Sequence, residues 1–382
     1  MLTYSTAGES HGKSLLALVD GFPAGLTIDE AFINHELRLR QGGYGRGGRQ
    51  KLEQDTVNIL SGVWQSVSLG SPIAMQIVNN DYKLERLKEL ERPRPGHADL
   101  TGAIKYLGSI RGVLERSSAR ETAARVAAGA LARLLLREFG IETVGYVVEL
   151  GEMKFGSEGT QGLSIGELRA RRDESTLYSV QPHTDRDAEA YIDRMADEGD
   201  TLGGIIEVRV DGLPFGLGTH AQWHRKLDGR LAQAVMAVQA IKGVEIGMGF
   251  EAARKRGSQV HDPIQHDASL AHLPHLGYVR PTNNAGGLEG GMTNGQALIL
   301  RAAKKPISTL RKPLESIRME DKQPHRANYE RSDVCAISAA SIIVEHVVAF
   351  EIATALVDKF GGDSLVEMKA RYELFMKMAR EH

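Results

Sequence analysis

The segment VDGFPAGL at residues 19–26 recurs as VDGLPFGL at residues 210–217, an offset of 191 residues, which is half of the 382-residue chain. A second match supports the first one. The pair Gly-Val at 62–63 precedes a glycine and the apolar run PIAMQIV, and the pair Gly-Leu at 287–288 precedes a glycine and the run ALILRA. Because the matches come in the same order in both halves, the sequence predicts an internal repeat.

The two halves have the same expected elements. A strand leads into an Asp-Gly-x-Pro turn, and a helix follows at about 28–40 in the first half and 224–240 in the second. Alternating strands are expected near 56–78 and 243–301. This order predicts that each half mixes strands with helices.

A long helix rich in Ala, Ser and Gly is expected to end each half, opened by Arg116-Ser117 in the first and by Arg331-Ser332 in the second. Helices with small residues on several faces pack closely together, so we expect both inside, with sheets covering them. The chain is then one pseudo-twofold domain over residues 1–382. Its expected parts are half-repeats at about 1–150 and 200–382, and polar peripheral insertions at about 151–200, 255–276 and 311–330.

The composition is typical of a soluble globular protein. Hydrophobic residues make up 42% and charged residues 25%, and the net charge is −2, whereas a non-specific nucleic-acid binder carries a basic surplus. The single cysteine, Cys335, excludes an internal disulfide framework and suits a reducing compartment. The start of the chain lacks a basic stretch followed by an apolar one, so no signal peptide is expected, and we predict a cytoplasmic protein.

The longest apolar stretch is SAASIIVEHVVAFEIATALV, at 338–357. It contains Glu345, His346 and Glu351, whose charges are costly at the centre of a bilayer. We therefore expect a buried helix, in a protein without a membrane span.

The segment RSSARE, which begins at Arg116, predicts an anion site. Ser118 and Glu121 have the spacing of a capping box, which places a helix N-terminus with free backbone N–H groups at this serine. The flanking arginine Arg120 adds positive charge. The alternative is an ordinary capped helix with solvated arginines. The equivalent Arg-Ser-Asp segment of the second half, ending at Asp333, favours the anion site, since pseudo-symmetry would bring both helix starts around one ligand.

A second basic segment, RLRQGGYGRGGRQK at 38–51, interleaves Arg38, Arg40, Arg46 and Arg49 with glycines and a tyrosine. Guanidinium groups beside open backbone suit phosphates and carboxylates. The alternatives are RNA binding, which RGG-like sequence favours, and a solvated basic loop. RNA binding is the weakest of the three because the segment is short and lies in a chain of balanced charge.

Two histidines lie among small residues, His11 in GESHG and His97 in RPRPGHAD. Histidine exchanges protons near neutral pH, and neighbouring glycines let a substrate approach it. Ser10 precedes the first histidine, and Arg92 and Arg94 precede the second, so each has neighbours that bind anions. A purely structural role is the alternative for each.

Three further motifs are less informative. The GKS at 12–14 lacks the glycine that a phosphate-binding P-loop needs five positions earlier, where Ala7 stands. The histidine-rich stretch at 261–275 fits no compact zinc signature, so no metal site is expected. The segment KKPIST at 304–309 offers cations, a rigid proline and two hydroxyls, which is an unspecific phosphate clamp.

Taken together, these segments resemble the successive signatures of the chorismate synthase family, in the family's order. They are GESHG, RQGGYGRGGRQ, RPGHAD, RSSARET, QAIKGVEIG, NAGGLEGG, KPIST and the RSD that precedes a long helix. The set is highly specific, although no single member is. One departure is Leu114-Glu115 before Arg116, where many relatives have glycines.

The resemblance implies a function. The family catalyses the anti-1,4-elimination of phosphate from 5-enolpyruvylshikimate-3-phosphate (EPSP) to give chorismate, the last common step of the shikimate pathway to aromatic amino acids. This reaction makes its members carbon-oxygen lyases that act on phosphates. Reduced flavin mononucleotide (FMN) is required without net redox change, because the flavin lends electron density as the allylic phosphate departs and recovers it afterwards.

The resemblance also implies a fold and an assembly. Members of the family are homotetramers whose chains place helices between two antiparallel sheets. The expected fold class is therefore α+β, a β-α-β sandwich of pseudo-twofold repeats with long central helices.

Roles for individual residues follow from the same resemblance. His11 resembles the histidine that protonates the departing phosphate, His97 the one that stabilises the reduced, anionic flavin near N1, and Asp333 the carboxylate that helps flavin N5 take the C6 proton. The expected FMN contacts are Arg116, Ser117, Ser118, Gln239, Ala240, Gly290, Lys305, Pro306, Ile307, Ser308, Thr309 and Arg331. The expected EPSP contacts are Ser10, Arg40, Arg46, Arg49, Arg94 and Arg120. NADPH, as a reductant of the flavin, is assigned to Arg40 and Arg46.

One other function class stays open, another phosphate- or nucleotide-handling enzyme such as a kinase. The missing Walker loop counts against it. Release of phosphate together with chorismate from EPSP distinguishes the two.

Overall fold

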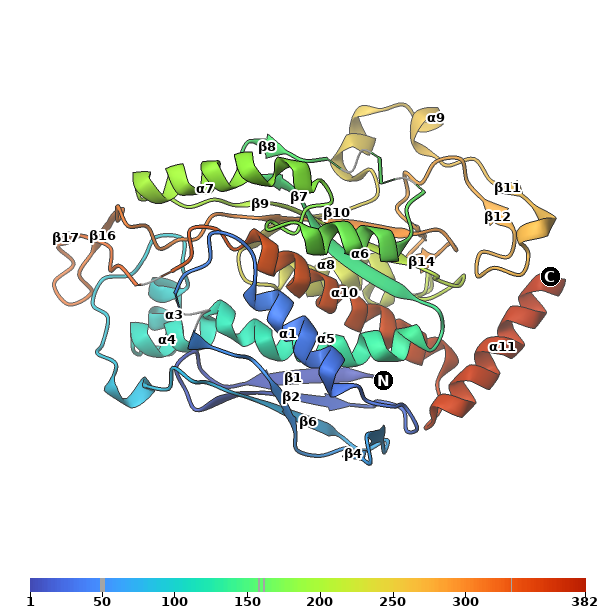
Figure 1. Cartoon of the computed structure of the whole chain (residues 1–382), viewed down its shortest axis with the longest axis horizontal. Helices are drawn as coiled ribbons and strands as arrows, with labels where there is room; N and C mark the ends of the chain where they lie inside the picture. The colour runs from blue at the N-terminus through green and yellow to red at the C-terminus, as the bar shows by residue number, and fades with distance from the viewer. Residues whose placement is uncertain (49–51, 157–158, 161, 331) are drawn as a thin grey trace.

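Two antiparallel sheets with helices between them form most of the molecule (Figure 1). The computed structural model describes residues 1–48, 52–156, 159–160, 162–330 and 332–382. The first sheet has the order β1-β2-β6-β3, with β1 at Thr3–Ala7, β2 at Ser14–Asp20, β6 at Ile73–Val78 and β3 at Val57–Ile59. The second has the order β10-β15-β9-β7-β8, with β10 at Ile241–Ile246, β15 at Leu298–Lys304, β9 at Gly204–Asp211, β7 at Glu142–Leu150 and β8 at Met153–Lys154.

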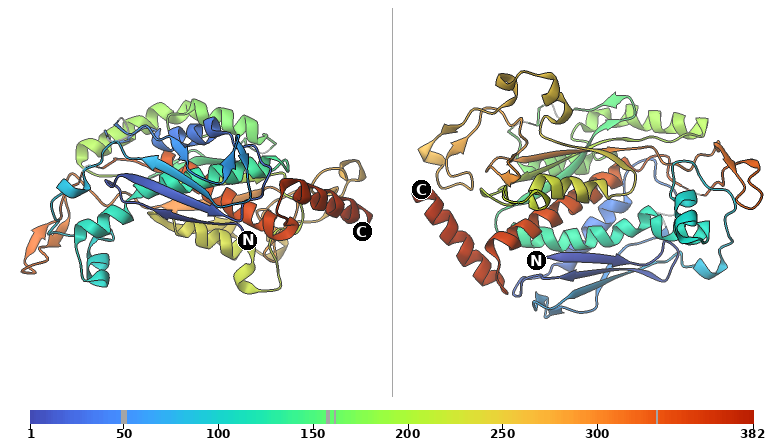
Figure 2. Two further views of the ribbon diagram at one scale, coloured as in Figure 1. Left: turned by 90° about the horizontal axis from the view of Figure 1, so that it is seen from below. Right: turned by 180° about the vertical axis from the view of Figure 1, so that it is seen from behind.

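The helices between the sheets are α1 at Glu30–Gln41, α5 at Thr122–Arg137, α8 at Leu227–Met236 and α10 at Ile337–Phe360. Helix α5 packs against β1, β2 and β6, whereas α10 packs against β7, β9 and β15, and the two helices pack on each other. Figure 2 shows the resulting layers from behind. The predicted α+β class is confirmed.

The two sheets have the same topology. The first sheet pairs β1 with β2, then β2 with β6 and β6 with β3, and the second sheet pairs β7 with β9, then β9 with β15 and β15 with β10. Strand β7 thus corresponds to β1, although it lies within the expected first half at about 1–150. Among the described residues, β8 is an addition at one edge of the second sheet. Short hairpins occupy the same place in both halves, namely β4 and β5 at Val63–Trp64 and Val67–Ser68, and β13 and β14 at Leu288–Glu289 and Met292–Thr293.

Sequence periodicity explains the layers. In β2, Leu15, Ala17 and Val19 are buried while Leu16 and Leu18 are exposed, so one face of the first sheet covers the helices. Helix α5 buries nearly all its residues because sheet and helices surround it.

The two long helices approach each other closely at Gly129 of α5. A Cβ atom at this position would lie 2.4 Å from both Cβ and the carbonyl oxygen of His346 on α10. A hydrogen in place of a side chain is therefore what lets the helices pack at this distance.

Helix α10 is a buried core helix, as predicted. Among the described residues it is the one helix long and apolar enough to cross a membrane, but 89% of its most apolar window is buried inside the fold. Its charged residues are paired there: Glu345 accepts from Arg172 Nη1 at 3.1 Å and lies 3.1 Å from Arg133 Nη1. These pairs explain how the buried part of the helix carries a carboxylate.

The predicted N-terminus at Ser118 is confirmed: Ser118 accepts from Arg120 N and caps a 3-10 turn at Ala119–Glu121, which continues directly into α5 at Thr122. The predicted capping box with Glu121 is wrong. The capping box does not form because Glu121 accepts hydrogen bonds from Thr6 and Gln239 instead, while the backbone N–H of Ser118 donates to Leu114 O.

The expected start of the second long helix is wrong as well. Helix α10 begins at Ile337, and Ser332 and Asp333 lie in the loop before it. Asp333 is held there by the backbone N–H of Gly47, 2.6 Å away, so it does not act as a helix cap.

The other elements are peripheral. They are α3 at Asp99–Tyr106, α4 at Ile110–Ser117, α6 at Ile165–Glu174, α7 at Asp185–Glu198, α9 at Gly257–Val260, α11 at Leu365–Glu381, and the hairpins β11 (Gln265–His266) with β12 (Tyr278–Val279) and β16 (Glu315–Ile317) with β17 (Pro324–Arg326). Figure 2 shows α11 projecting from one end of the molecule and the β16–β17 hairpin from the other.

Candidate functional site

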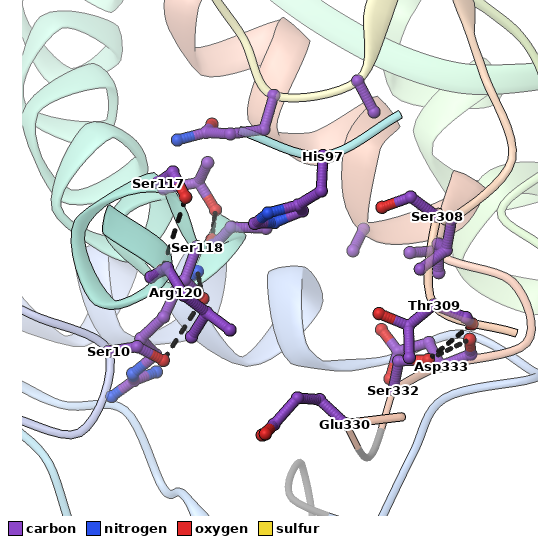
Figure 3. Close-up of a pocket in the computed structure, with 18 of the residues that line it drawn as sticks. Ser10, His97, Ser117, Ser118, Arg120, Ser308, Thr309, Glu330, Ser332 and Asp333 are labelled. Atoms are coloured by element: carbon purple, nitrogen blue, oxygen red, sulfur yellow. Dashed lines mark hydrogen bonds between the residues drawn. The ribbon is translucent and has the colours of Figure 1, made fainter. Parts of the chain in front are cut away.

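A cavity of about 920 Å³ is lined by residues from both halves of the chain. Figure 3 shows Ser10, Ser117, Ser118 and Arg120 on one side of it, and Thr309, Ser332 and Asp333 on the other. The volume is near the upper end of small-molecule sites, which span about 300–1,000 Å³. The cavity is therefore large enough for two small ligands side by side.

Most predicted site residues line this cavity. They are Ser10, His11, Arg40, Arg46, Arg94, His97, Ser117, Ser118, Arg120, Gln239, Ala240, Lys305, Pro306, Ile307, Ser308, Thr309 and Asp333. Arg49 and Arg331 lie outside the described residues.

Two predicted FMN contacts do not line the cavity. Arg116 donates to the carbonyl oxygens of Gly8 and Thr6, at 3.1 and 2.9 Å, and so ties α4 to the end of β1. Gly290 is exposed in the turn between β13 and β14.

His11 lies between a buried carboxylate and a polar loop. Its Nδ1 is 3.0 Å from Glu115 Oε2, and its Nε2 is 3.7 Å from Asp81 Oδ2. Burial alone would raise the pKa of Glu115, but the hydrogen bonds and charge of His11 outweigh this effect and lower it. The carboxylate thus stays ionised near neutral pH and accepts hydrogen bonds.

His97 has a similar partner. Its Nδ1 lies 2.5 Å from Asp99 Oδ1. Asp99 also accepts from Arg94, at 2.8 Å from Nε and 3.0 Å from Nη2. Burial opposes ionisation of this carboxyl, yet His97 and Arg94 hold its pKa well below its usual range. Arg94 reaches across to Thr309 as well, at 2.8 Å, and so joins the two walls of the cavity.

Asp333 is fixed by the glycine-rich segment of the first half. It accepts from Gly47 N at 2.6 Å and pairs with Arg46 Nη1 at 3.1 Å. A Cβ at residue 47 would lie 3.1 Å from the Asp333 carboxylate, so the glycine permits this contact. The segment at 38–51 therefore contributes backbone as well as guanidinium groups to the site.

Arg40 and Arg120 share one buried acid, Asp55. Arg120 Nη1 donates to its carboxylate at 2.7 Å and Arg40 Nη1 at 3.4 Å. Arg40 also donates to Thr122 Oγ1 at 3.0 Å and Ala119 O at 3.1 Å. Burial lowers the pKa of Arg40 to about 9, against the opposing effect of Asp55. Most donors of Arg40 are thus used within the protein.

The cavity is nevertheless built for anions. Its lining holds eight lysines and arginines against four aspartates and glutamates. Some buried polar atoms on the lining have no hydrogen-bond partner among the described residues, namely Arg46 Nε, Arg111 Nη1, Arg120 Nη2 and Gln239 Oε1. Buried polar groups are normally satisfied, so the three guanidinium nitrogens point to ligand oxygens that accept, and the amide oxygen points to a ligand group that donates.

Sequence reasoning missed several charged residues of the lining. They are Glu53, Asp81, Lys83, Lys304, Arg111 and Glu330. None belongs to a motif with a chemical meaning of its own, except that Lys304 begins KKPIST. Arg111 could have been suspected because it lies one turn before Glu115 on α4, next to RSSARE.

Comparison with known proteins shows to which family the chain belongs. The chorismate synthase family model matches residues 2–357. Over the full length of both chains, the protein is 53% identical to a chorismate synthase of Geobacter metallireducens and 52% identical to one of Desulforamulus reducens. A solved structure described as a crystal structure of chorismate synthase matches with a TM-score of 0.82 and 41% identity, over 100% of this chain and 99% of the other. By coverage and identity, the chain belongs to the chorismate synthase family.

Proposed function

We propose that this protein catalyses the lyase reaction of its family, the anti-1,4-elimination of phosphate from EPSP to give chorismate. The observation that carries the proposal is that His11, His97 and Asp333 line one cavity whose other charged residues are mainly arginines and lysines. The reaction removes an anionic leaving group and one proton, so it needs cations and a small number of proton-transfer groups. The alternative of another phosphate- or nucleotide-handling enzyme is not favoured.

Cations of the cavity would bind the substrate. EPSP carries a phosphate and two carboxylates, and Arg46 Nε and Arg120 Nη2 are buried donors that have no hydrogen-bond partner among the described residues. Charge-assisted hydrogen bonds from guanidinium groups suit such oxygens. Arg94 and Arg40 have most donors engaged by Asp99, Thr309 and Asp55, so they would act mainly by charge and by shaping the wall.

Two side chains would handle the protons. His11 would donate a proton to the departing phosphate from Nε2, since Nδ1 faces Glu115. Asp333 would assist removal of the C6 proton, and the hydrogen bond from Gly47 N with the charge of Arg46 orients its carboxylate.

We propose reduced FMN as the cofactor. Lys305, Ser308 and Thr309 offer cationic and hydroxyl groups suited to its phosphate, while Ala336, Ala339 and Ala340 offer an apolar wall suited to its ring, all on the cavity lining. Gln239 Oε1, a buried acceptor with no hydrogen-bond partner in the described part of the chain, suits an N–H of the ring. When bound, reduced FMN supplies electron density to the allylic system as phosphate leaves. His97 would hold the anionic side of the ring.

We also propose the finer features that the resemblance implies. The chain would be one domain of two half-repeats, which the equal strand order of the two sheets supports. It would act as a homotetramer in the cytoplasm. Apolar side chains on the outer face of the first sheet, Leu16, Leu18 and Val78, support burial of that face in an assembly.

The test is anaerobic incubation of the protein with EPSP and reduced FMN, with phosphate and chorismate measured together. Equal amounts of both products are expected, and oxidised FMN in place of reduced FMN serves as the control. A correctly folded protein that forms neither product would contradict the proposal. NADPH oxidation in the presence of FMN tests separately whether the protein reduces its own flavin through Arg40 and Arg46.

A further inference from the structure

Glu115 binds His11 through its carboxylate and the neighbouring Ser10 through its carbonyl oxygen. Its carboxylate oxygens Oε1 and Oε2 lie 3.1 and 3.0 Å from His11 Nδ1. Oε2 also accepts the backbone N–H of His11 at 2.8 Å, and the Glu115 carbonyl oxygen accepts from Ser10 N at 2.8 Å. The glutamate therefore fixes both the ring and the backbone of His11.

These contacts determine which ring nitrogen faces the cavity. An ionised carboxylate only accepts hydrogen bonds, so the Nδ1 beside it carries the hydrogen. The Glu115 side chain is 1% exposed and that of His11 is 14% exposed, so water does not compete well for this bond. Nε2 is left as the nitrogen that exchanges a proton with a ligand.

The other charged groups around His11 are largely occupied with one another. Lys83 Nζ pairs with Asp81 Oδ2 at 2.7 Å. This pair lies on the Nε2 side of the ring, where Asp81 Oδ2 is 3.7 Å from His11 Nε2. On the Glu115 side, Arg111 Nη1 is 3.7 Å from Oε1, while Arg111 Nη2 pairs with Glu330 at 3.0 Å. Among the described side chains, the one that hydrogen-bonds the Glu115 carboxylate is thus the imidazole itself.

The second histidine of the site gives a useful contrast. Asp99 accepts from His97, but it accepts also from the side chain of Arg94, through both Nε and Nη2. Its negative charge is therefore shared with a guanidinium group. Within the described parts of the chain, Glu115 accepts no comparable direct bond from an arginine, so more of its charge acts on His11.

We propose that Glu115 is a positioning residue for His11: its carboxylate holds the Nδ1 hydrogen, directs Nε2 into the cavity and stabilises the protonated ring that serves as the acid. The proposal rests on the proposed function, in which His11 protonates the departing phosphate. It assigns no contact between Glu115 and either ligand.

The kinetic test compares Glu115→Gln with the wild-type protein under anaerobic conditions with reduced FMN. Glutamine keeps the shape but removes the charge. We expect kcat to fall about 10- to 100-fold, because an orienting carboxylate acts through general acid catalysis worth about 10²- to 10⁴-fold. The KM for EPSP should stay within about twofold, since no ligand contact is lost.

The alkaline limb of the pH–rate profile should move to lower pH. Glu351→Gln, which removes a carboxylate that pairs with Arg230 outside the cavity, should leave that limb in place.

A second measurement does not depend on turnover. In protein labelled with ¹⁵N-histidine, the His11 signals, assigned by their loss in His11→Ala, should show hydrogen on Nδ1 in the neutral ring. In Glu115→Gln the two tautomers should mix. The double variant His11→Ala/Glu115→Gln should be no slower than His11→Ala alone, because the glutamate acts through this ring.

Three outcomes would overturn the positioning role. They are an unshifted pH limb in a folded Glu115→Gln protein, an unchanged tautomer, and additive losses in the double variant. Failure of the proposed function looks different: the wild-type protein would then form no chorismate, or His11→Ala would retain the wild-type rate. The tautomer of His11 can be read in either case.

Discussion

The role of His11 can be tested at the level of a single residue. His11→Ala removes the group that would protonate the departing phosphate, so we expect kcat to fall by about 10²- to 10⁴-fold. Binding of FMN and EPSP should persist, because Arg46, Arg94 and Arg120 stay in the wall. The measurement is anaerobic turnover together with titration of both ligands. His272→Ala, at an exposed site in the 255–276 segment, should keep the wild-type rate. A wild-type rate across the pH range in His11→Ala would exclude the acid role.

His97 should affect the flavin more than the departing phosphate. In His97→Ala, Asp99 keeps its bonds to Arg94, so the wall should stay in place while the group beside the flavin is lost. We expect a changed absorption spectrum of the bound reduced flavin, recorded anaerobically, and weaker binding. His11→Ala is the matched control and should leave that spectrum unchanged. Identical spectra for His97→Ala and wild type would contradict the assignment.

At the scale of elements, the contact of α5 with α10 depends on Gly129. In Gly129→Ala the new methyl group would meet His346 backbone and Cβ atoms at 2.4 Å, so the helices must separate. Overpacking of this kind costs about 1–3 kcal/mol of the free energy of unfolding. Gly229→Ala in α8 is the control: the nearest atom lies 4.0 Å away, and a gain of about 0.5–1 kcal/mol is expected for alanine in a helix. Chemical denaturation of both variants measures the difference, and equal stabilities would contradict this view of the helix contact.

A buried ion pair between α1 and α5 makes stability depend on pH. Glu36 lies 2.8 Å from Arg133 and 3.3 Å from His346. Burial alone would raise the pKa of Glu36, but these two partners lower it from 4.5 to about 2. A carboxyl whose pKa is lower in the folded state contributes stability above its unfolded pKa, and this stability is lost as pH falls from about 4.5 towards 2.

Glu36→Gln should therefore flatten the stability profile in that pH window. At neutral pH the free energy of unfolding of the variant should be about 3 kcal/mol lower, because Arg133 then has one buried counter-charge fewer. Glu142→Gln, which breaks an exposed pair with Arg169, should cost about 1 kcal/mol or less. The measurement is the free energy of unfolding from denaturation curves recorded between about pH 7 and about pH 2. If this free energy depended on pH in the same way in Glu36→Gln and in the wild-type protein, the lowered pKa of Glu36 would be contradicted.

At the scale of the whole molecule, the outer face of the first sheet bears on assembly. Leu18 on β2 is 45% exposed, and Leu16 and Val78 lie on the same face. In Leu18→Glu we expect the sedimentation mass to fall from that of four chains of 41.7 kDa each to a smaller species, with the far-ultraviolet circular dichroism retained. Ile264→Glu, at an exposed apolar residue of the 255–276 segment, should keep the assembly. An unchanged mass for Leu18→Glu would show that this face is not an interface.

Local sequence patterns predict much of the fold and of the candidate site. The repeated segments, the alternation in β2 and the small residues of α5 and α10 predict mixed layers with buried helices, because turn chemistry and periodicity act over a few residues. The ordered signatures identify the family and point to most of the residues that line the cavity. The capping box at Ser118 and the start of α10 were less predictable, since Glu121 and Asp333 found partners outside their own turns.

Partnerships between distant segments depend on tertiary packing. Glu115 and His11 are 104 residues apart, Arg120 and Asp55 are 65 apart, and Asp333 and Gly47 are 286 apart. No spacing rule connects such positions, because the packing of α4 against the loop at residues 8–12, and of one half against the other, brings them together. Packing therefore decides which arginines keep free donors and which histidine nitrogen faces the cavity: buried polar groups must take the partners that the fold places beside them.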